Sequence, residues 1–65
     1  MVEPIFTVGQ LVQFGYGKIP HRVLAVITTG RIPTYDVECQ EGLMKYRRRY
    51  GVPQQMLKHY YPRNR

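Results

Sequence analysis

The chain has 65 residues, 43% of them hydrophobic, and ten Lys and Arg against four Asp and Glu give it a net charge of +6. This length leaves room for one domain with a small core, and the apolar fraction, with six Tyr and two Phe, excludes a disordered polyelectrolyte. One cysteine excludes an internal disulfide and no stretch is apolar enough for a signal peptide or a membrane span, so we expect a soluble, cytoplasmic protein whose single domain spans residues 1–65.

The first two predicted strands lie in the N-terminal half of the chain. Strand one covers residues 10–14, where Val12 and Phe14 alternate with polar neighbours and are expected to face the core. Strand two runs from about residue 21 to 29 and is apolar on both faces between residues 23 and 27. A strand that is apolar on both faces is central or strongly curled, so we expect strand two to be the best buried.

The third predicted strand, residues 34–39, alternates between apolar and polar side chains after a hairpin turn at residues 29–31. Its inner face is expected to consist of Tyr35, Val37 and Cys39, and its outer face of Thr34, Asp36 and Glu38. The outward acids are placed to form cross-strand salt bridges with Lys45 or Arg47. Such bridges would reduce the positive charge that is available to a ligand.

Positive charge is concentrated in the last third of the chain. Residues 45–65 contain seven Lys and Arg and no acid, which gives this segment +7 and the remaining 44 residues −1. A surface that serves only solubility usually mixes charges of both signs. The segregation therefore favours a one-sided basic surface that binds an anionic polymer, although basic side chains on an edge strand also prevent strand pairing between molecules.

The fourth predicted strand, residues 43–50, contains the run Lys-Tyr-Arg-Arg-Arg-Tyr. Alternation divides its neighbourhood into a solvent face, Lys45, Arg47 and Arg49, and an inner face, Met44, Tyr46, Tyr50 and Val52. Arg48 falls on the inner side, where a cation must snorkel outward at a rim, and the pattern does not explain its direction. A helix is the alternative because the two tyrosines stand four residues apart, but Gly42, Gly51 and Pro53 leave it too few turns.

The C-terminal part of the chain is expected to close the fold. Residues 53–56 predict a single helical turn that begins with proline, and residues 57–61 predict a short last strand. The barrel then covers about residues 6–60, and residues 61–65 form a basic C-terminal tail.

These elements together are similar to a known class of small barrels. The segment Phe6-Thr7-Val8-Gly9-Gln10-Leu11-Val12, a strand ending at Ile27 before Gly30, the alternating third strand and Val52-Pro53-Gln54-Gln55-Met56-Leu57 resemble the Src-homology-3-like (SH3-like) β-barrel of the Tudor or KOW type. The resemblance implies an all-β fold of five strands with a short helical turn before the last one. Proteins of this superfold bind nucleic acid, methylated tails, peptides or partner proteins, so it implies a binding module without naming the ligand.

The leading functional hypothesis is a nucleic-acid-binding module that is not an enzyme. Its candidate contacts are the cations of the fourth strand and the tail and one loop tyrosine: Lys45, Arg47, Arg48, Arg49, Lys58, Arg63, Arg65 and Tyr16. Tyr60 and Tyr61 are further candidates for stacking on bases, whereas core packing is the favoured use of Tyr46 and Tyr50. DNA and RNA, and single and double strands, stay open.

The alternative hypothesis is a protein-interaction or assembly module that docks an acidic partner. In that reading Leu24 and Val26, opposite the core face of strand two, form a contact between copies of the chain. The size also matches small accessory proteins of phages or mobile elements.

Other chemistries are disfavoured by spacing. His21, Cys39 and His59 lack the paired spacing of a metal site, so we expect no metal and no cofactor. No nucleophile with a base and an orienting group stands out, which disfavours catalysis. An aromatic cage for a methylated cation would draw on Phe14, Tyr16, Tyr35 and Asp36, but the positive field of the chain opposes a basic ligand.

Overall fold

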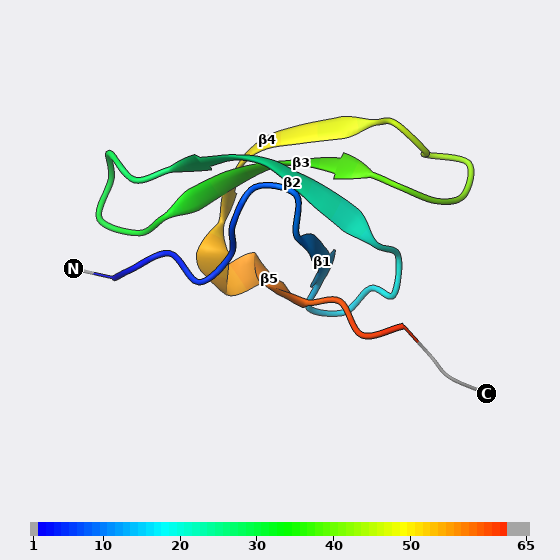
Figure 1. Ribbon diagram of the computed structural model, residues 1–65, viewed down its shortest axis with the longest axis horizontal. Coiled ribbons are helices and arrows are strands. Elements are labelled where there is room, and N and C mark those ends of the chain that lie inside the picture. The colour runs from blue at the N-terminus through cyan, green and yellow to red at the C-terminus, as the bar shows by residue number, and fades with distance from the viewer. Residues whose placement is uncertain (1, 63–65) are drawn as a thin grey trace.

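The computed structural model describes residues 2–62, which form one curved antiparallel sheet with a short 3-10 turn (Figure 1). In chain order the elements are β1 (Leu11–Phe14), β2 (His21–Ile27), β3 (Thr34–Cys39), β4 (Arg48–Pro53), η1 (Gln54–Met56) and β5 (Leu57–His59). The sheet order is β4-β3-β2-β1-β5, and the sheet is open, with β4 and β5 as its edges. The expected all-β fold of five strands with a helical turn before the last one is confirmed.

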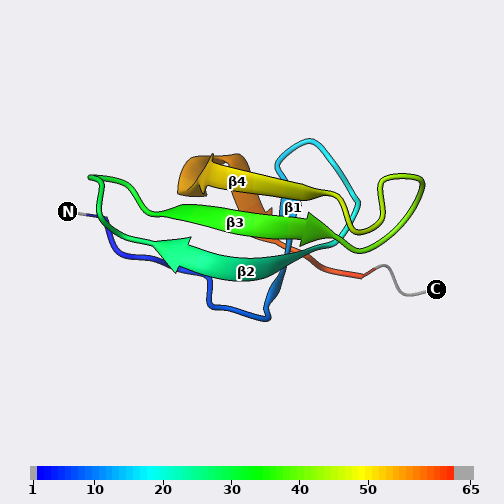
Figure 2. The ribbon, with the colours of Figure 1, turned by 90° about the horizontal axis from the view of Figure 1, so that it is seen from above.

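The sheet curls so that its two ends face each other across the core. In Figure 1, β2, β3 and β4 form one layer, with β1 and β5 below it. Figure 2 shows these three strands running side by side while β1 passes them at an angle. A register shift between Val23 and Ala25 interrupts the pairing of β2 with β3, and such a bulge increases local twist and bending.

The core lies between these layers. Its buried members are Phe6, Val12, Val23, Tyr35, Val37, Val52 and Leu57, with Phe14 and Val26 packed against them. The inward directions predicted for strands one and three are therefore confirmed, and Cys39 is buried as well. The prediction that strand two is the best buried is wrong: only Val23 of β2 is buried, because its apolar run bends at the bulge, whereas β3 alternates without interruption.

A buried glutamine fastens the N-terminal segment to the core. Gln54 Oε1 accepts hydrogen bonds from the Tyr35 hydroxyl and from the Ile5 backbone N–H at 3.0 Å. Its Nε2 donates to the Glu3 carbonyl at 3.1 Å. We call these contacts the Gln54 clasp. It satisfies the buried Gln54 amide and Tyr35 hydroxyl, and it holds Ile5 directly before Phe6, which is buried in the core.

The fourth strand differs from the sequence-based expectation. Residues 41–46 form bends and turns, and β4 begins only at Arg48. Gly42 and Tyr46 both adopt positive φ angles, 81° and 73°, which an extended strand does not allow. The Tyr46 N–H donates to the Cys39 carbonyl at 2.7 Å, which closes the hairpin tip. The core position predicted for this tyrosine is wrong, because the turn leaves its ring exposed.

A bulge at Gly51 decides the directions of the arginines in β4. Val52 pairs with Tyr35 and Arg49 pairs with Val37, so β4 has one residue more than β3 between these points. Gly51 has a φ of 66° and donates its N–H to Asp36 Oδ1 at 3.0 Å. The extra residue reverses the alternation that a regular strand would keep.

The bulge changes the side-chain directions predicted for Arg49 and Tyr50 and explains that of Arg48. Arg49 lies on the same side of the sheet as its partner Val37, opposite to the face predicted for it, although its side chain is exposed to solvent as predicted. Arg48 lies opposite Glu38 on the outer face, which explains the direction that the sequence pattern left unexplained. Tyr50 is exposed at the bulge, so its predicted core position is wrong.

Candidate nucleic-acid interface

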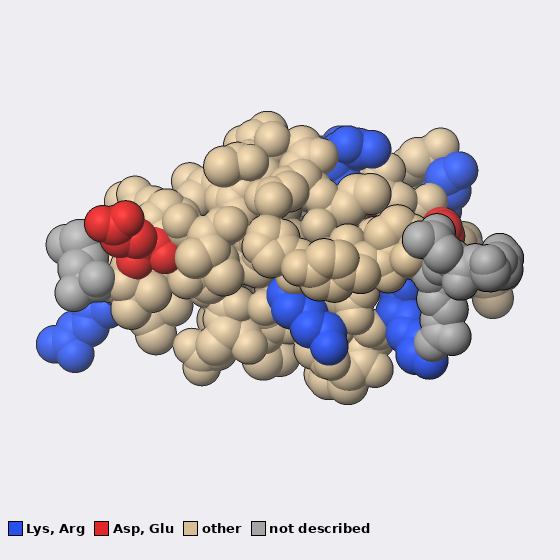
Figure 3. Space-filling view, turned by 60° about the horizontal axis from the view of Figure 1, so that its bottom comes forward, with Lys and Arg blue, Asp and Glu red and all other residues tan. Residues whose placement is uncertain are grey.

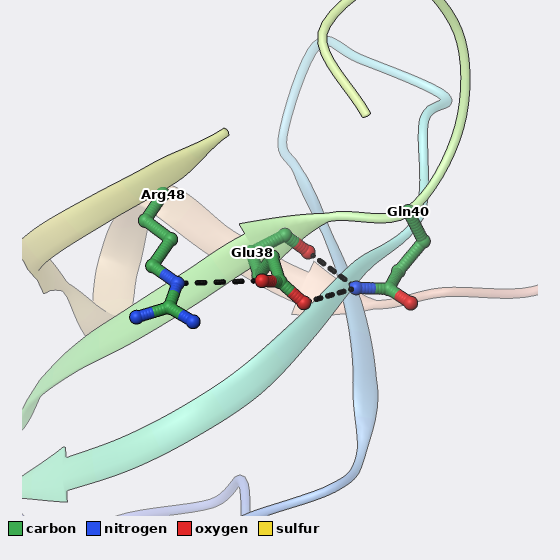
Figure 4. A network of polar contacts seen from close by, with 3 residues as sticks. All are labelled: Glu38, Gln40 and Arg48. Atoms are coloured by element: carbon green, nitrogen blue, oxygen red, sulfur yellow. Dashed lines mark hydrogen bonds and ion pairs between the residues drawn. The ribbon is translucent and has the colours of Figure 1, made fainter. Parts of the chain in front are cut away.

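Arg48 is engaged by an acid of β3 (Figure 4). Its Nε lies 3.3 Å from Glu38 Oε2, and Gln40 Nε2 donates to Glu38 Oε1 at 3.3 Å and to the Glu38 carbonyl at 3.0 Å. The nearby Tyr50 hydroxyl and then the Glu38 carboxylate raise the pKa of Arg48 above its ordinary value. The salt bridges predicted from Glu38 to Lys45 or Arg47 are wrong, because the bulge brings Arg48 opposite this acid.

The other acid of β3 is occupied as well. Asp36 accepts the Gly51 N–H and so serves the backbone of the bulge. Within residues 2–62, the Arg48–Glu38 contact is the one salt bridge. Within the described residues, Lys45, Arg47 and Arg49 therefore form no salt bridge.

Two of these cations line a hollow that we call the arginine hollow. It encloses about 240 Å³ where β1 and β3 end and β2 and β4 begin. Its lining residues are Phe14, Tyr16, Gly17, Ile19, His21, Cys39, Met44, Arg47 and Arg49. The arrangement combines two guanidinium groups with an apolar and aromatic wall.

Aromatic contacts give the arginine hollow its geometry. The Arg49 guanidinium lies 5.4 Å from the centre of the Phe14 ring, within the range of cation–π attraction. The same ring also contacts His21, whose ring meets it edge-on at a centroid distance of 5.0 Å. His21 Nδ1 lies 3.0 Å from the Ile19 carbonyl and is the donor, since a carbonyl oxygen only accepts.

A second hollow, which we call the lysine hollow, lies along the other side of β1. It encloses about 450 Å³ and is lined by Gln13, Lys18, Lys58, Tyr60 and Tyr61. Gln13 and Lys58 are register partners on β1 and β5, and successive residues of a strand face opposite sides. Gln13 therefore faces the lysine hollow while Phe14 faces the arginine hollow.

The loop of residues 15–20 connects the two hollows. It contributes Tyr16 to the arginine hollow and Lys18 to the lysine hollow. Two hydrogen bonds hold its start: Gln13 Nε2 donates to the Gly17 carbonyl, and the Gly17 N–H donates to the Phe14 carbonyl, both at 2.9 Å. The loop thus lies between the two hollows and is held in place by these hydrogen bonds.

The structure places the candidate residues of the sequence in five groups. Arg47, Arg49 and Tyr16 meet in the arginine hollow, and Lys58 lines the lysine hollow with Tyr60 and Tyr61. Lys45 lies in the exposed turn with its ammonium 5.1 Å from the Tyr46 ring centre, and Arg48 is paired. Arg63 and Arg65 lie outside the described residues. Sequence reasoning missed Lys18, whose signal was its place beside Tyr16 in a glycine-flanked loop.

On the face that Figure 3 draws, the basic side chains do not merge into one stripe. Figure 3 shows them on one face as separate groups with neutral surface between them, most of them in the right-hand half of the view. Binding through such a surface depends on individual cations placed beside rings, more than on one continuous field.

The described part of the chain contains neither a cluster of metal ligands nor the aromatic cage that the sequence could have formed. No three His, Cys, Asp or Glu side chains gather there in a way that could hold a metal ion. Cys39 is buried, and its thiol donates to the Glu41 carbonyl at 3.1 Å. Tyr35 is fully buried in the Gln54 clasp, so the aromatic cage that would have used it is not formed.

No helix within residues 2–62 has the length and apolarity that a bilayer crossing requires. Comparisons of the chain with protein-family models, with curated proteins and with solved structures find no match.

Proposed function

We propose that the protein is a non-enzymatic module that binds nucleic acid through cations placed beside aromatic rings. The observation that carries the proposal is the arginine hollow, where Arg47 and Arg49 adjoin Tyr16 and Phe14 while the acids of β3 are occupied elsewhere. Guanidinium groups bind phosphates, and exposed rings bind base faces. The lysine hollow offers the same pair of chemistries with Lys18 and Lys58.

The proposal predicts a salt-sensitive association. Four cations line the two hollows, and each phosphate contact releases condensed counterions. The log–log slope of affinity against salt is expected to be roughly −4 on a duplex and roughly −3 on a single strand. The sequence preference is expected to be weak, because phosphate contacts carry no base information.

The experiment compares two double variants by fluorescence anisotropy with labelled oligonucleotides at low and moderate salt. R47Q/R49Q removes the two hollow arginines, and we expect roughly tenfold weaker binding and a slope reduced by about 2. The control, E38Q/R48Q, removes the ion pair between β3 and β4 without changing the net charge. We expect its affinity to stay within about twofold of the unaltered protein, since these groups satisfy each other.

Two results would contradict the proposal. The first is that the unaltered protein binds no nucleic acid at low salt. The second is that both double variants bind as well as the unaltered protein, with an unchanged salt slope.

We also propose that the fold belongs to the SH3-like barrels. The support is the set of five short antiparallel strands that curl around one core, with η1 directly before β5. This assignment concerns architecture alone, because that superfold hosts many ligands. An experimental structure whose β1 and β5 do not pair would contradict it.

A second candidate function, a protein-interaction module, is supported by the hairpin tip between β3 and β4. Leu43 is fully exposed there, next to the exposed side chains of Met44 and Tyr46. Neighbouring exposed apolar side chains mark interaction sites in many soluble proteins. The contact first predicted for Leu24 and Val26 loses support, because both are half-buried and Val26 packs on the core. Sedimentation of the unaltered protein and of L43S would detect self-association through this tip.

A further inference from the structure

The two hollows repeat one combination of groups on either side of a single loop. The arginine hollow pairs two guanidinium groups with Tyr16, and the lysine hollow pairs two ammonium groups with Tyr60 and Tyr61. Among the described residues that line them, none is acidic. A ligand that meets both hollows must therefore carry repeated negative charge and repeated flat faces.

The exposure of the rings decides which form of nucleic acid fits. The ring-bearing side chains of Tyr16 and Tyr61 are 87% and 75% exposed, so their faces are open to a partner. In a duplex the bases are stacked on each other, and their faces are covered. Unpaired bases have free faces that stack on aromatic side chains. The hollows consequently suit a single strand better than a duplex.

The size of the arginine hollow points in the same direction. Its volume of about 240 Å³ lies below the roughly 300–1,000 Å³ of clefts that hold drug-sized ligands. A space of this size with an apolar wall accommodates one planar ring system. Arg47 and Arg49 at its side can contact the phosphates that flank that ring.

The loop between the hollows is tethered at Gly17 by hydrogen bonds with Gln13 and Phe14. A tethered loop loses little conformational entropy when a ligand binds, which favours affinity. Because residues 16 and 18 belong to different hollows, a strand that crosses the loop passes from one hollow to the other.

We propose that the protein binds single-stranded nucleic acid, with one base stacked in each hollow and the sugar–phosphate backbone crossing the loop of residues 15–20. The inference rests on the proposed nucleic-acid binding and adds the strand form, the path and the stacking residues. Tyr16 supplies the ring of one base site, and Tyr60 and Tyr61 supply those of the other.

The test uses the full chain and two labelled probes in anisotropy titrations at low salt. One probe is a thymidine oligonucleotide of about twelve nucleotides, within the site sizes of small single-strand-binding folds, and the other is a duplex of similar length. Y16A and Y61A are expected to weaken binding of the single strand roughly tenfold each, because each removes one stacking platform. Neither change is expected to alter binding of the duplex.

The matched control is Y50A, which removes an exposed ring that lines neither hollow. It is expected to leave both affinities unchanged. A second readout is tyrosine fluorescence, which the absence of Trp makes accessible and which stacking on thymine quenches. Y16A should retain less of this quenching than Y50A, and far-UV circular dichroism checks that all variants keep the fold.

The outcomes separate this inference from the proposed function. If the duplex binds as tightly as the single strand, or if Y16A behaves like Y50A, the single-strand inference is wrong while salt-dependent binding still supports the proposed function. If neither probe binds at low salt, both proposals are wrong. A preference for the single strand that Y16A and Y61A each reduce supports the inference.

Discussion

Replacing Gln54 with Met removes the Gln54 clasp while keeping a side chain of similar length. Gln54 is the one buried polar side chain among residues 2–62, and three groups depend on it: the Ile5 N–H, the Glu3 carbonyl and the Tyr35 hydroxyl. Met fills the space but neither donates to the carbonyl nor accepts strongly from the other two groups. The substitution therefore removes the protein donor to the Glu3 carbonyl and leaves the Ile5 N–H with the Tyr35 hydroxyl as its acceptor.

The expected loss of stability follows from these contacts. An unsatisfied buried donor or acceptor costs about 1–3 kcal/mol, and water reaches the partly buried Ile5 and Glu3 groups. The Tyr35 hydroxyl also accepts the Ile5 N–H at 3.2 Å, which keeps part of the network. We expect Q54M to lower the free energy of unfolding by about 2–3 kcal/mol, a large share of the roughly 3–5 kcal/mol that a core of this size supplies.

Urea unfolding followed by far-UV circular dichroism measures the effect. The control is Q55M, which changes the exposed neighbour in the same 3-10 turn and should stay within about 0.5 kcal/mol of the unaltered protein. Combining Y35F with Q54M should cost less than the sum of the single changes, because both partners of one hydrogen bond are then apolar. If Q54M unfolds at the same urea concentration as Q55M, the clasp contributes no stability and the reasoning is refuted.

Two further predictions concern backbone angles. G51A places a Cβ at a φ of 66° and should lower the free energy of unfolding by about 1–2 kcal/mol. The control G15A, where a Cβ meets open space and φ is not positive, should stay within about 0.5 kcal/mol of the unaltered protein. Equal urea midpoints for the two variants would contradict the bulge geometry. Y46G should raise stability by up to about 1 kcal/mol, since glycine adopts the φ of 73° without strain and the lost ring is exposed. A loss of more than about 1 kcal/mol in Y46G would show that the ring packs in the fold.

Regular alternation made the third strand predictable. Tyr35, Val37 and Cys39 face inward as expected because β3 pairs on both sides and is free of bulges within its own sequence. The helical turn at η1 was also predictable, since a proline precedes a short polar stretch there. These elements follow local rules that the fold does not override.

The fourth strand was not predictable in the same way. The alternation rule assumes one residue on each strand at every step, and Gly51 adds a residue that reverses the faces before it. A glycine within a strand pattern is a known signal of a bulge and was available in the sequence. The positive φ of Tyr46 carried no signal, because tyrosine rarely adopts that conformation.

The sequence indicated which basic residues are candidates for ligand contact, but not which of them lie together in one hollow. The basic run pointed to Arg47 and Arg49, but their meeting with Tyr16 depends on the curl of the sheet, which brings the end of β1 and the start of β4 to one hollow although these strands do not pair. Lys18 was missed because it lies outside the acid-free segment that supplied the candidate residues. Charge counts along a chain do not report which cations share a surface.

The bulge at Gly51 makes two adjacent arginines chemically unequal. Arg48 forms a salt bridge with Glu38, while the Arg49 guanidinium lies over the Phe14 ring. The one extra residue of β4 determines which arginine lies opposite Glu38. Regular alternation of the same sequence from Val52, without the bulge, would place Arg49 and not Arg48 opposite Glu38. The position of an arginine relative to Gly51 thus decides whether its guanidinium is held in an ion pair, as in Arg48, or lies beside an aromatic ring, as in Arg49.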